Sequence, residues 1–342
     1  MVAQHFMTTT SGLRGEHESM SDQRRLTIDR IEQATSVIDP VFLNLPQFEC
    51  DALSAELGCH LTLKIETMNP IRCFKGRGAD WLVAEAARRG EGRVMICASA
   101  GNFGQAMAYA GTRRGCSVTV YAAETASPLK VQRMRAPGAN VQLFGADFDA
   151  AKTEARRVAE ALGARFVEDS RDVETAEGAG TIGLELVSAL DEPVDDVIVP
   201  LGNGAMLNGI ATAIRALSPD ARIVAVQASG APAMTETLRS GRIVETRTAE
   251  TIADGIAVRA PVPEAVSDMT GLVDDALLVD DAAIKTAMRR LYASAGLVTE
   301  PAGAIGVAAI AENPSRFEGR RVATVICGAN ATPEQLSGWG VV

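Results

Sequence analysis

The sequence contains few aromatic residues: Phe, Trp and Tyr make up 4% of its 342 residues, whereas 47% are hydrophobic. Small aliphatic residues therefore supply most of the apolar content. Such a composition favours buried parallel strands and helices over a surface that stacks on bases or sugars. The net charge is −10, and no cluster of Lys and Arg is large enough to offset it. We therefore expect no nucleic-acid partner.

Histidine is also scarce, with three residues, so a His-based metal site or catalytic triad is not expected. None of the six cysteines belongs to a CxxC pair, so neither a structural zinc site nor a disulfide framework is indicated. No apolar run is long enough to span a membrane, and the N-terminal residues lack the hydrophobic segment of a secretion signal. These absences predict a protein of the reducing cytoplasm without a membrane span.

The length suits about two domains. Residues 1–24 are polar and predict a flexible leader. From residue 93 onwards short apolar strands alternate with helices, which is typical of parallel sheets that are covered on both faces. The strands that we predict are 60–65, 94–97, 117–121, 140–143, 196–199, 223–226, 277–279 and 322–326. The clearest helices are 105–114, 150–162, 205–216 and 283–293. Residues 230–275 are less regular and are left without assigned elements.

The loop 202–209, Gly-Asn-Gly-Ala-Met-Leu-Asn-Gly, follows a predicted strand and opens a helix. Free backbone N–H groups at a helix start favour a phosphate. A nucleotide-binding P-loop would require Gly-Lys-Ser/Thr, which is absent. A dinucleotide site would require an acidic residue after the next strand, where Gln227 stands. A single phosphate therefore fits better, although an ordinary tight turn between strand and helix would use the same residues.

Two further loops follow predicted strands. In 99–105, Ser99 and Asn102 lie at the predicted start of a helix. Their side chains and the free N–H groups there would bind a carboxylate, but the same residues would also serve as an ordinary helix N-cap. In 327–330, Cys327 follows the last buried strand and would also serve as a small hydrophobic residue in a turn. Because carboxyl ends of parallel strands meet at one edge of a sheet, these loops and 202–209 are expected to face a common cleft.

The stretch 69–79 gives this cleft its chemistry. Lys75 lies there between a turn and two glycines, and by itself it would suit an ordinary surface charge. Together with a phosphate cradle and a carboxylate cradle, it suits a Schiff base with pyridoxal phosphate, which acts as an electron sink.

Cys73-Phe74-Lys75-Gly76-Arg77-Gly78-Ala79 resembles a motif of the fold-type II pyridoxal-phosphate enzymes, in the branch of the serine/threonine dehydratases and serine racemases. The resemblance covers about residues 28–332 and includes four motifs in the family's order. It implies that Lys75 is the Schiff-base lysine and the base at Cα. It also implies a set of residues that bind cofactor or substrate. The cofactor set is Phe74, Lys75, Asn102, Gly202, Asn203, Gly204, Ala205, Met206, Glu300 and Cys327, and the substrate-carboxylate set is Ser99, Ala100, Gly101 and Asn102.

The resemblance further implies the fold, which is two three-layer α/β domains with mostly parallel sheets, similar to tryptophan synthase β. Residues 25–93 and 172–342 would form the large cofactor domain, and residues 94–171 a small domain that closes over the substrate. The implied enzyme is a homodimeric, cytoplasmic ammonia-lyase. It would convert a β-hydroxy amino acid such as threonine or serine to a 2-keto acid and ammonia.

The sequence departs from the family at several positions. Ala100 stands where racemases carry a second acid/base serine, which disfavours racemisation. Gln227 stands where the branch's divalent metal has an acidic ligand, so we predict no metal. Arg72 replaces a small residue next to Cys73, which itself replaces a serine. The positive charge of Arg72 would bind an acidic substrate side chain or pair with an acid at the rim of the pocket.

Two alternatives to β-elimination share most of these residues. A β-replacement synthase, of the cysteine synthase or diaminopropionate synthase type, would hold the same dehydrated substrate for a second nucleophile. A non-catalytic pyridoxal-phosphate-binding protein would retain the fold without turnover. The intact Lys75 and Asn102 favour an enzyme.

Overall fold

The computed structural model describes residues 24–342, so the predicted leader, with His5 and His17, lies outside the described residues except for Arg24. The chain forms two sheets. The larger has the strand order β1-β2-β10-β7-β8-β9, and the smaller has the order β5-β4-β3-β6. All strand pairs are parallel except β1 with β2. The strands are β1 (Gln47–Glu49), β2 (His60–Ile65), β3 (Val94–Ala98), β4 (Ser117–Ala122), β5 (Asn140–Leu143), β6 (Arg165–Val167), β7 (Asp196–Pro200), β8 (Arg222–Ala228), β9 (Asp275–Val279) and β10 (Arg321–Ile326).

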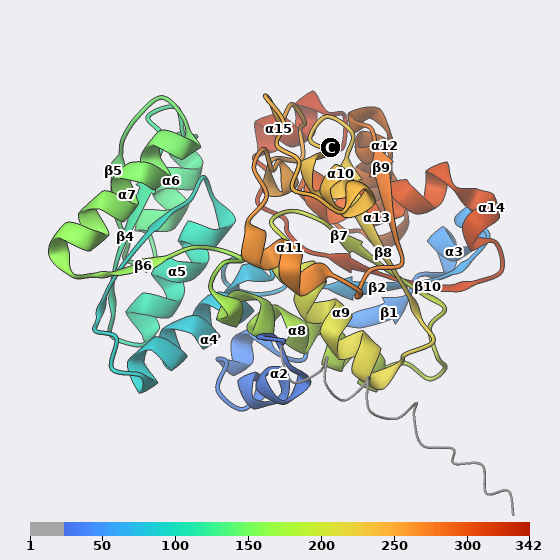
Figure 1. Ribbon diagram of the computed structural model, residues 1–342. Coiled ribbons are helices and arrows are strands. Elements are labelled where there is room, and N and C mark those ends of the chain that lie inside the picture. The colour runs from blue at the N-terminus through green and yellow to red at the C-terminus, as the bar shows by residue number, and fades with distance from the viewer. Residues whose placement is uncertain (1–23) are drawn as a thin grey trace, which may run out of the picture.

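Helices lie against both sheets, and the smaller sheet with α5, α6 and α7 stands apart on the left of Figure 1. The longer helices are α4 (Lys75–Arg88), α5 (Asn102–Arg113), α7 (Phe148–Leu162), α8 (Val173–Ser188), α9 (Ala205–Leu217), α12 (Asp281–Ala295) and α13 (Pro301–Glu312). The shorter ones are α2 (Ile28–Thr35), α3 (Asp51–Leu57), α6 (Pro128–Arg135), α10 (Ala233–Ser240), α11 (Pro263–Met269), α14 (Pro314–Phe317) and α15 (Pro333–Gly338), with two 3-10 turns, η1 (Pro40–Phe42) and η2 (Asp254–Ile256).

The eight predicted strands are confirmed within one or two residues at each end, as is the α/β class. Two strands, β1 and β6, were not predicted because each has only three residues, which is too short to show a periodicity. The unassigned region 230–275 contains α10, η2 and α11.

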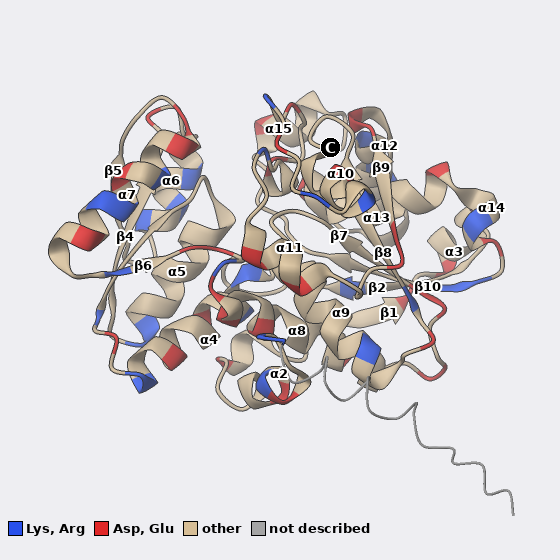
Figure 2. Ribbon diagram, in the orientation of Figure 1, with Lys and Arg blue, Asp and Glu red and all other residues tan. Residues whose placement is uncertain are grey.

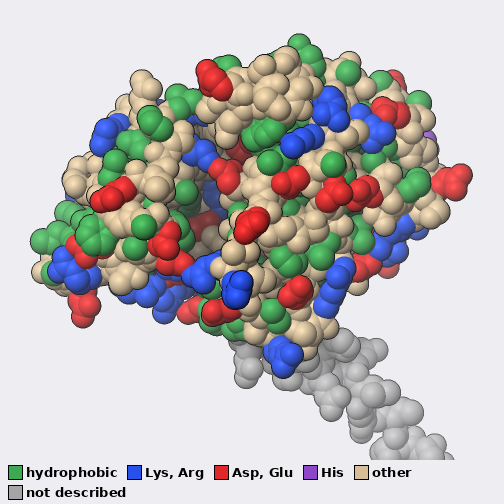
Figure 3. All heavy atoms as spheres, turned by 90° about the horizontal axis from the view of Figure 1, so that it is seen from above, with side chains coloured by type: hydrophobic (Ala, Val, Ile, Leu, Met, Phe, Trp, Pro, Cys, Tyr) green, Lys and Arg blue, Asp and Glu red, His purple; other side chains and the backbone are tan. Residues whose placement is uncertain are grey.

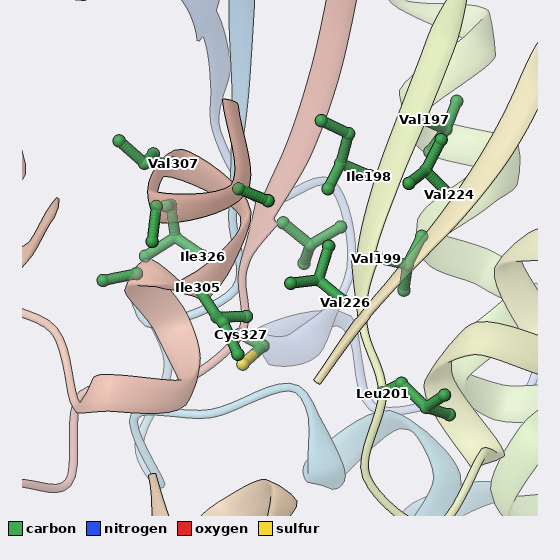
Figure 4. Close-up of a cluster of buried hydrophobic side chains, with 14 of the residues drawn as sticks. Val197, Ile198, Val199, Leu201, Val224, Val226, Ile305, Val307, Ile326 and Cys327 are labelled. Atoms are coloured by element: carbon green, nitrogen blue, oxygen red, sulfur yellow. The ribbon is translucent and has the colours of Figure 1, made fainter. Parts of the chain in front are cut away.

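The core of the larger sheet consists of small aliphatic side chains, as the scarcity of aromatics predicts. All five residues of β7 are buried. Figure 4 shows Val197 and Val199 of β7 among neighbours from β8, β10 and α13, with Cys327 at the end of the cluster. A strand that is covered on both faces holds the loop that follows it in a fixed position.

Helices α4 and α8 pack closely enough that their contact requires glycine. A Cβ atom added to Gly78 would lie 2.5 Å from the carbonyl oxygen of Thr175, and one added to Gly178 would lie 2.5 Å from that of Arg77. The close contact ties the start of α4, where Lys75 lies, to the helix that follows the smaller sheet.

The proposed domain division at residues 94–171 coincides with the strands of the smaller sheet. Residues outside that range, including Phe42 and Leu82, nevertheless belong to the same buried cluster as Met95 and Val118 of this sheet. The division into folding units therefore stays a prediction.

Charged residues of both signs are intermixed along the helices (Figure 2). In the part of the chain that the structure describes, no helix is both long and apolar enough to span a bilayer. Two surface hollows, of about 220 and 320 Å³, lie around β1, β2 and α3 and include none of the predicted site residues.

Candidate active site

The stretch before Lys75 pairs with the end of β10. The Phe74 N–H donates to the Cys327 carbonyl at 3.0 Å, and the Ala329 N–H donates to the Arg72 carbonyl at 3.0 Å. These bonds flank an antiparallel bridge between Cys73 and Gly328. They bring two segments that are some 250 residues apart in the sequence into direct contact, as the common-edge argument requires.

The Lys75 ammonium group lies in a largely buried polar environment. Its Nζ is 2.6 Å from Oδ2 of Asp169 and 4.7 Å from the centre of the Phe74 ring. The two charged side chains are 17% and 12% exposed. Nδ2 of Asn203, from the predicted phosphate loop, lies 3.4 Å from the same carboxylate oxygen. Lys75 thus faces both the end of β6 and the loop after β7.

Asp169 was not predicted as a site residue. It lies two residues after β6, at the same carboxyl edge as the predicted loops. Because the three-residue strand β6 was not recognised, the position of Asp169 at that edge was not recognised either. A polar residue directly after a short apolar run was the only signal available.

The predicted phosphate loop has free backbone donors. Gly204 has φ +105°, which favours glycine, and α9 begins at the next residue. Among residues 24–342, no protein acceptor binds the N–H groups of Asn203, Gly204 and Met206. Ala205 adopts helical geometry as the first residue of α9, so this position does not require glycine. Free amides at the positive end of a helix fit a phosphate group.

In the loop 99–102, Ser99 and Asn102 have different surroundings. Oγ of Ser99 accepts the N–H groups of Gly101 at 3.1 Å and Gly104 at 2.8 Å, so it caps α5. Asn102 extends across the cleft: its Nδ2 donates to Oε1 of Glu300 at 2.8 Å, and its Oδ1 accepts from Nδ2 of Asn330 at 2.8 Å. The two sheets therefore meet through Asn102.

Glu300 precedes α13 and is 7% exposed. Besides Asn102 it accepts the backbone N–H of Asn330 at 3.0 Å. Burial raises the pKa of this carboxyl above its ordinary value, and the nearby charge of Asp254 raises it further. The side chain lies directly against Gly328, since a Cβ added there would be 2.3 Å from its Oε1.

The two cysteines of the site are buried. Burial raises the thiol pKa of both Cys73 and Cys327, and the negative charge of Glu300 adds to the effect. The nucleophile of cysteine chemistry is the thiolate, so these residues act as neutral, weakly polar side chains.

Basic residues surround the Asn102 end of the cleft. Arg133, on α6, donates from Nη1 to the carbonyl and to Oδ1 of Asn330, at 3.1 and 3.3 Å. Lys130, one turn earlier, pairs with Asp254 and has its stem 3.4 Å from where a Cβ on Gly101 would lie. Arg72 has an unusual φ of 55° and is exposed. Sequence reasoning missed Arg133 and Lys130, because nothing local distinguishes them from surface charges on a helix.

The structure thus brings together the predicted Lys75, Phe74, Asn102, Glu300, Cys327 and the loop 202–206 at one edge of the two sheets. In Figure 3 a hollow between the two parts of the molecule contains basic and acidic side chains. Ser99 has a capping role in addition to the one predicted for it, and Ala100 contributes only a methyl group. No group of three or more His, Cys, Asp and Glu residues that could hold a metal occurs in the described part of the chain.

Comparisons with known proteins agree with this geometry. The family model described as "Pyridoxal-phosphate dependent enzyme" matches residues 38–328, so the chain belongs to this family. An L-threonine ammonia-lyase of Thermotoga maritima is 34% identical over 305 residues, which cover 89% of this chain and 76% of that protein. Among solved structures, threonine deaminase isoform 2 of Solanum lycopersicum has a TM-score of 0.84 at 29% identity, covering 93% of this chain and 90% of that one. Maize serine racemase has a TM-score of 0.86 at 28% identity, covering 92% and 96%.

The predicted class is therefore confirmed. The protein is an enzyme that uses pyridoxal phosphate, has the fold-type II architecture and falls in the branch of the serine/threonine dehydratases.

Proposed function

We propose that the protein catalyses β-elimination from a β-hydroxy amino acid, such as threonine or serine, to a 2-keto acid and ammonia. The observation that supports this most directly is Lys75, which lies in a shielded polar site between the loop of free amides and the Asn102 end of the cleft. The similarity to threonine ammonia-lyases across most of both chains points to the same reaction.

We assign the binding of pyridoxal phosphate to residues whose free groups fit it. The free amides of Asn203, Gly204 and Met206 would hold the phosphate. Lys75 would carry the aldehyde carbon, and Asn102 and Cys327 would border the ring. When bound, the cofactor supplies an electron sink for the charge that develops at the substrate's Cα.

The amine of Lys75 takes the proton from Cα, and Asp169 stabilises the ammonium group that results. The β-hydroxyl leaves as water after taking up a proton. The unsaturated amine that remains is hydrolysed to the keto acid and ammonia. Closure of the residues 94–171 over the site would keep other water out during these steps.

Racemisation is the second activity to test, because serine and aspartate racemases are among the structural relatives. It requires an acid/base group on the face opposite the lysine. Ala100 has none, which favours elimination. A β-replacement synthase would differ in forming keto acid only slowly unless a second nucleophile is added.

The decisive test compares Lys75→Ala with Lys285→Ala, a lysine of α12 that belongs to none of the loops of the site. We expect wild type and Lys285→Ala to show the visible absorbance of bound cofactor and to form keto acid from threonine or serine. Lys75→Ala should lose the absorbance and at least about 10³-fold in kcat, because it lacks both the covalent attachment and the base. Unchanged absorbance in Lys75→Ala would refute the assignment.

We also propose a cytoplasmic homodimer, which rests on the family resemblance alone. Light scattering of the purified full chain tests the dimer, and a monomeric mass would contradict it.

A further inference from the structure

Arg72 has a backbone conformation that favours glycine. Its φ of 55° lies in the left-handed region, which residues other than glycine usually avoid. Its carbonyl is held by the Ala329 N–H, so the strained backbone is part of the contact that positions Lys75 three residues later. The exposed side chain of Arg72 is therefore carried on a backbone that the bond to Ala329 holds in place.

Arg133 approaches the same place from the other sheet. Its Nη1 binds Asn330, and Nδ2 of Asn330 donates in turn to the carbonyl of Ile71, the neighbour of Arg72, at 2.9 Å. The side chain is partly buried, and burial followed by the positive charge of Arg72 lowers the pKa of Arg133. Asn330 therefore joins Arg133 to the backbone beside Arg72.

Neither arginine forms an ion pair with an acidic residue in the described part of the chain, although the negative charge of Glu300 acts on Arg133 and partly offsets the effect of Arg72. Lys130 pairs with Asp254. Glu300 receives its hydrogen bonds from Asn102 and the backbone of Asn330, and not from an arginine. Two neighbouring guanidinium groups that form no ion pair of their own can bind an anion between them, and carboxylates fit this group in a two-pronged geometry.

We propose that Arg72 and Arg133 bind a carboxylate on the side chain of the substrate, which makes the substrate a 2-amino-3-hydroxy dicarboxylic acid with 3-hydroxyaspartate as the smallest member. This inference rests on the proposed function, since it names the substrate class of the same reaction. The α-carboxylate of the substrate would bind to the loop 99–102.

The reaction balances without any further reagent. Loss of the Cα proton and of the β-hydroxyl removes one water from 3-hydroxyaspartate, and addition of one water to the resulting imine releases ammonia. The product is oxaloacetate, and the reaction needs no external oxidant or reductant.

The experiment compares kcat/KM for threo- and erythro-3-hydroxy-L-aspartate, L-threonine and O-phospho-L-serine. We expect a 3-hydroxyaspartate to be preferred. In Arg72→Ala and Arg133→Ala the ratio of its kcat/KM to that of threonine should fall by about 10- to 100-fold, since a charged hydrogen bond contributes about 1.5–3 kcal/mol. The matched control is Arg135→Ala on the same helix, whose side chain is exposed and donates only to the Val141 carbonyl. This change should leave the ratio unaltered.

A second measurement does not require turnover. L-Aspartate and L-asparagine differ in side-chain charge but not in shape, and their binding to the cofactor-loaded protein is followed by thermal melting. Preferential binding of aspartate that disappears in both arginine variants supports the inference, even if no hydroxy amino acid is turned over and the proposed function fails.

Equal binding of the two amino acids would overturn the inference. So would arginine variants that lower turnover of 3-hydroxyaspartate and threonine by the same factor. Preference for O-phospho-L-serine would show that the two arginines bind a phosphate rather than a carboxylate. It would refute the proposal of a dicarboxylic substrate.

Discussion

At the scale of single residues, Glu300 and Gly328 illustrate how tightly the site is built. A buried carboxyl group normally carries a large cost unless it is hydrogen bonded or protonated. Glu300 is bonded to Asn102 and Asn330, and yet its pKa is raised by burial. The same side chain fills the space that any residue larger than glycine would need at position 328.

The raised pKa of Glu300 predicts a pH-dependent stability. Because the native pKa exceeds the unfolded one, near 4.5, the ionised carboxyl destabilises the fold above the native pKa. The penalty disappears below about pH 4.5, where both states are protonated. We therefore expect Glu300→Gln, which keeps an acceptor oxygen, to raise the free energy of unfolding more at pH 8 than at pH 5. Urea unfolding at the two pH values measures this, and a gain that is larger at pH 5 would contradict it.

Gly328→Ala is expected to displace Glu300. The added methyl group would overlap Oε1, and such overpacking costs about 1–3 kcal/mol. Because Glu300 holds Asn102, kcat should also fall. Gly338→Ala is the control, since a Cβ there meets nothing within 4 Å. Chemical unfolding and keto-acid formation should distinguish the two variants, and identical behaviour would show that the site adapts.

At the scale of elements, helix α4 is anchored at its start by a buried ionic network. Arg77 is fully buried and forms two-pronged bonds to Glu66, at 2.8 and 2.9 Å, and to Glu185, at 2.6 and 2.8 Å. Lys64 completes the network at 2.6 Å from Glu185. Two cations and two carboxylates, from β2 and the residue after it, α4 and α8, balance each other. This fixes the position of α4 and hence of Lys75.

Removal of Arg77 should leave two buried carboxylates with too few partners. Arg77→Met is expected to cost about 3–5 kcal/mol of folding free energy, as is typical when one member of a buried ion pair is lost. Arg88→Met, on the same helix but exposed and paired only with Glu85, should change stability little. Equal midpoints of urea unfolding for the two variants would refute the structural role of the network.

At the scale of the whole molecule, the smaller sheet and its helices contact the larger sheet through polar groups around the cleft. Two ion pairs, Lys130 with Asp254 and Arg259 with Asp149, connect them beside the bond from Arg133 to Asn330. Contacts of this kind are sensitive to salt and easily broken, which suits a cleft that must open for substrate.

The double variant Asp149→Asn, Asp254→Asn should loosen this connection. We expect KM for the amino acid to rise severalfold, with little change in the free energy of unfolding, because the open form gains population without loss of either core. Glu154→Gln breaks an ion pair within α7 and serves as the control. If the control raises KM equally, or hydrogen exchange of α6 is unchanged in the double variant, the two ion pairs do not regulate opening.

Local sequence alone determined four of the longer helices (α5, α7, α9 and α12), eight strands, the loops after them and the position of Lys75. Each depends on periodicity or on turn residues within a few positions, so the common edge and the chemistry could be inferred from Lys75 and the loops 99–102 and 202–206. The tertiary structure alone decided that Asp169 faces Lys75, that Asn102 bridges to Glu300, and that Arg133 is joined through Asn330 to the backbone beside Arg72. These contacts join residues that are far apart in the sequence, and their energy depends on the burial and charge that the whole fold creates.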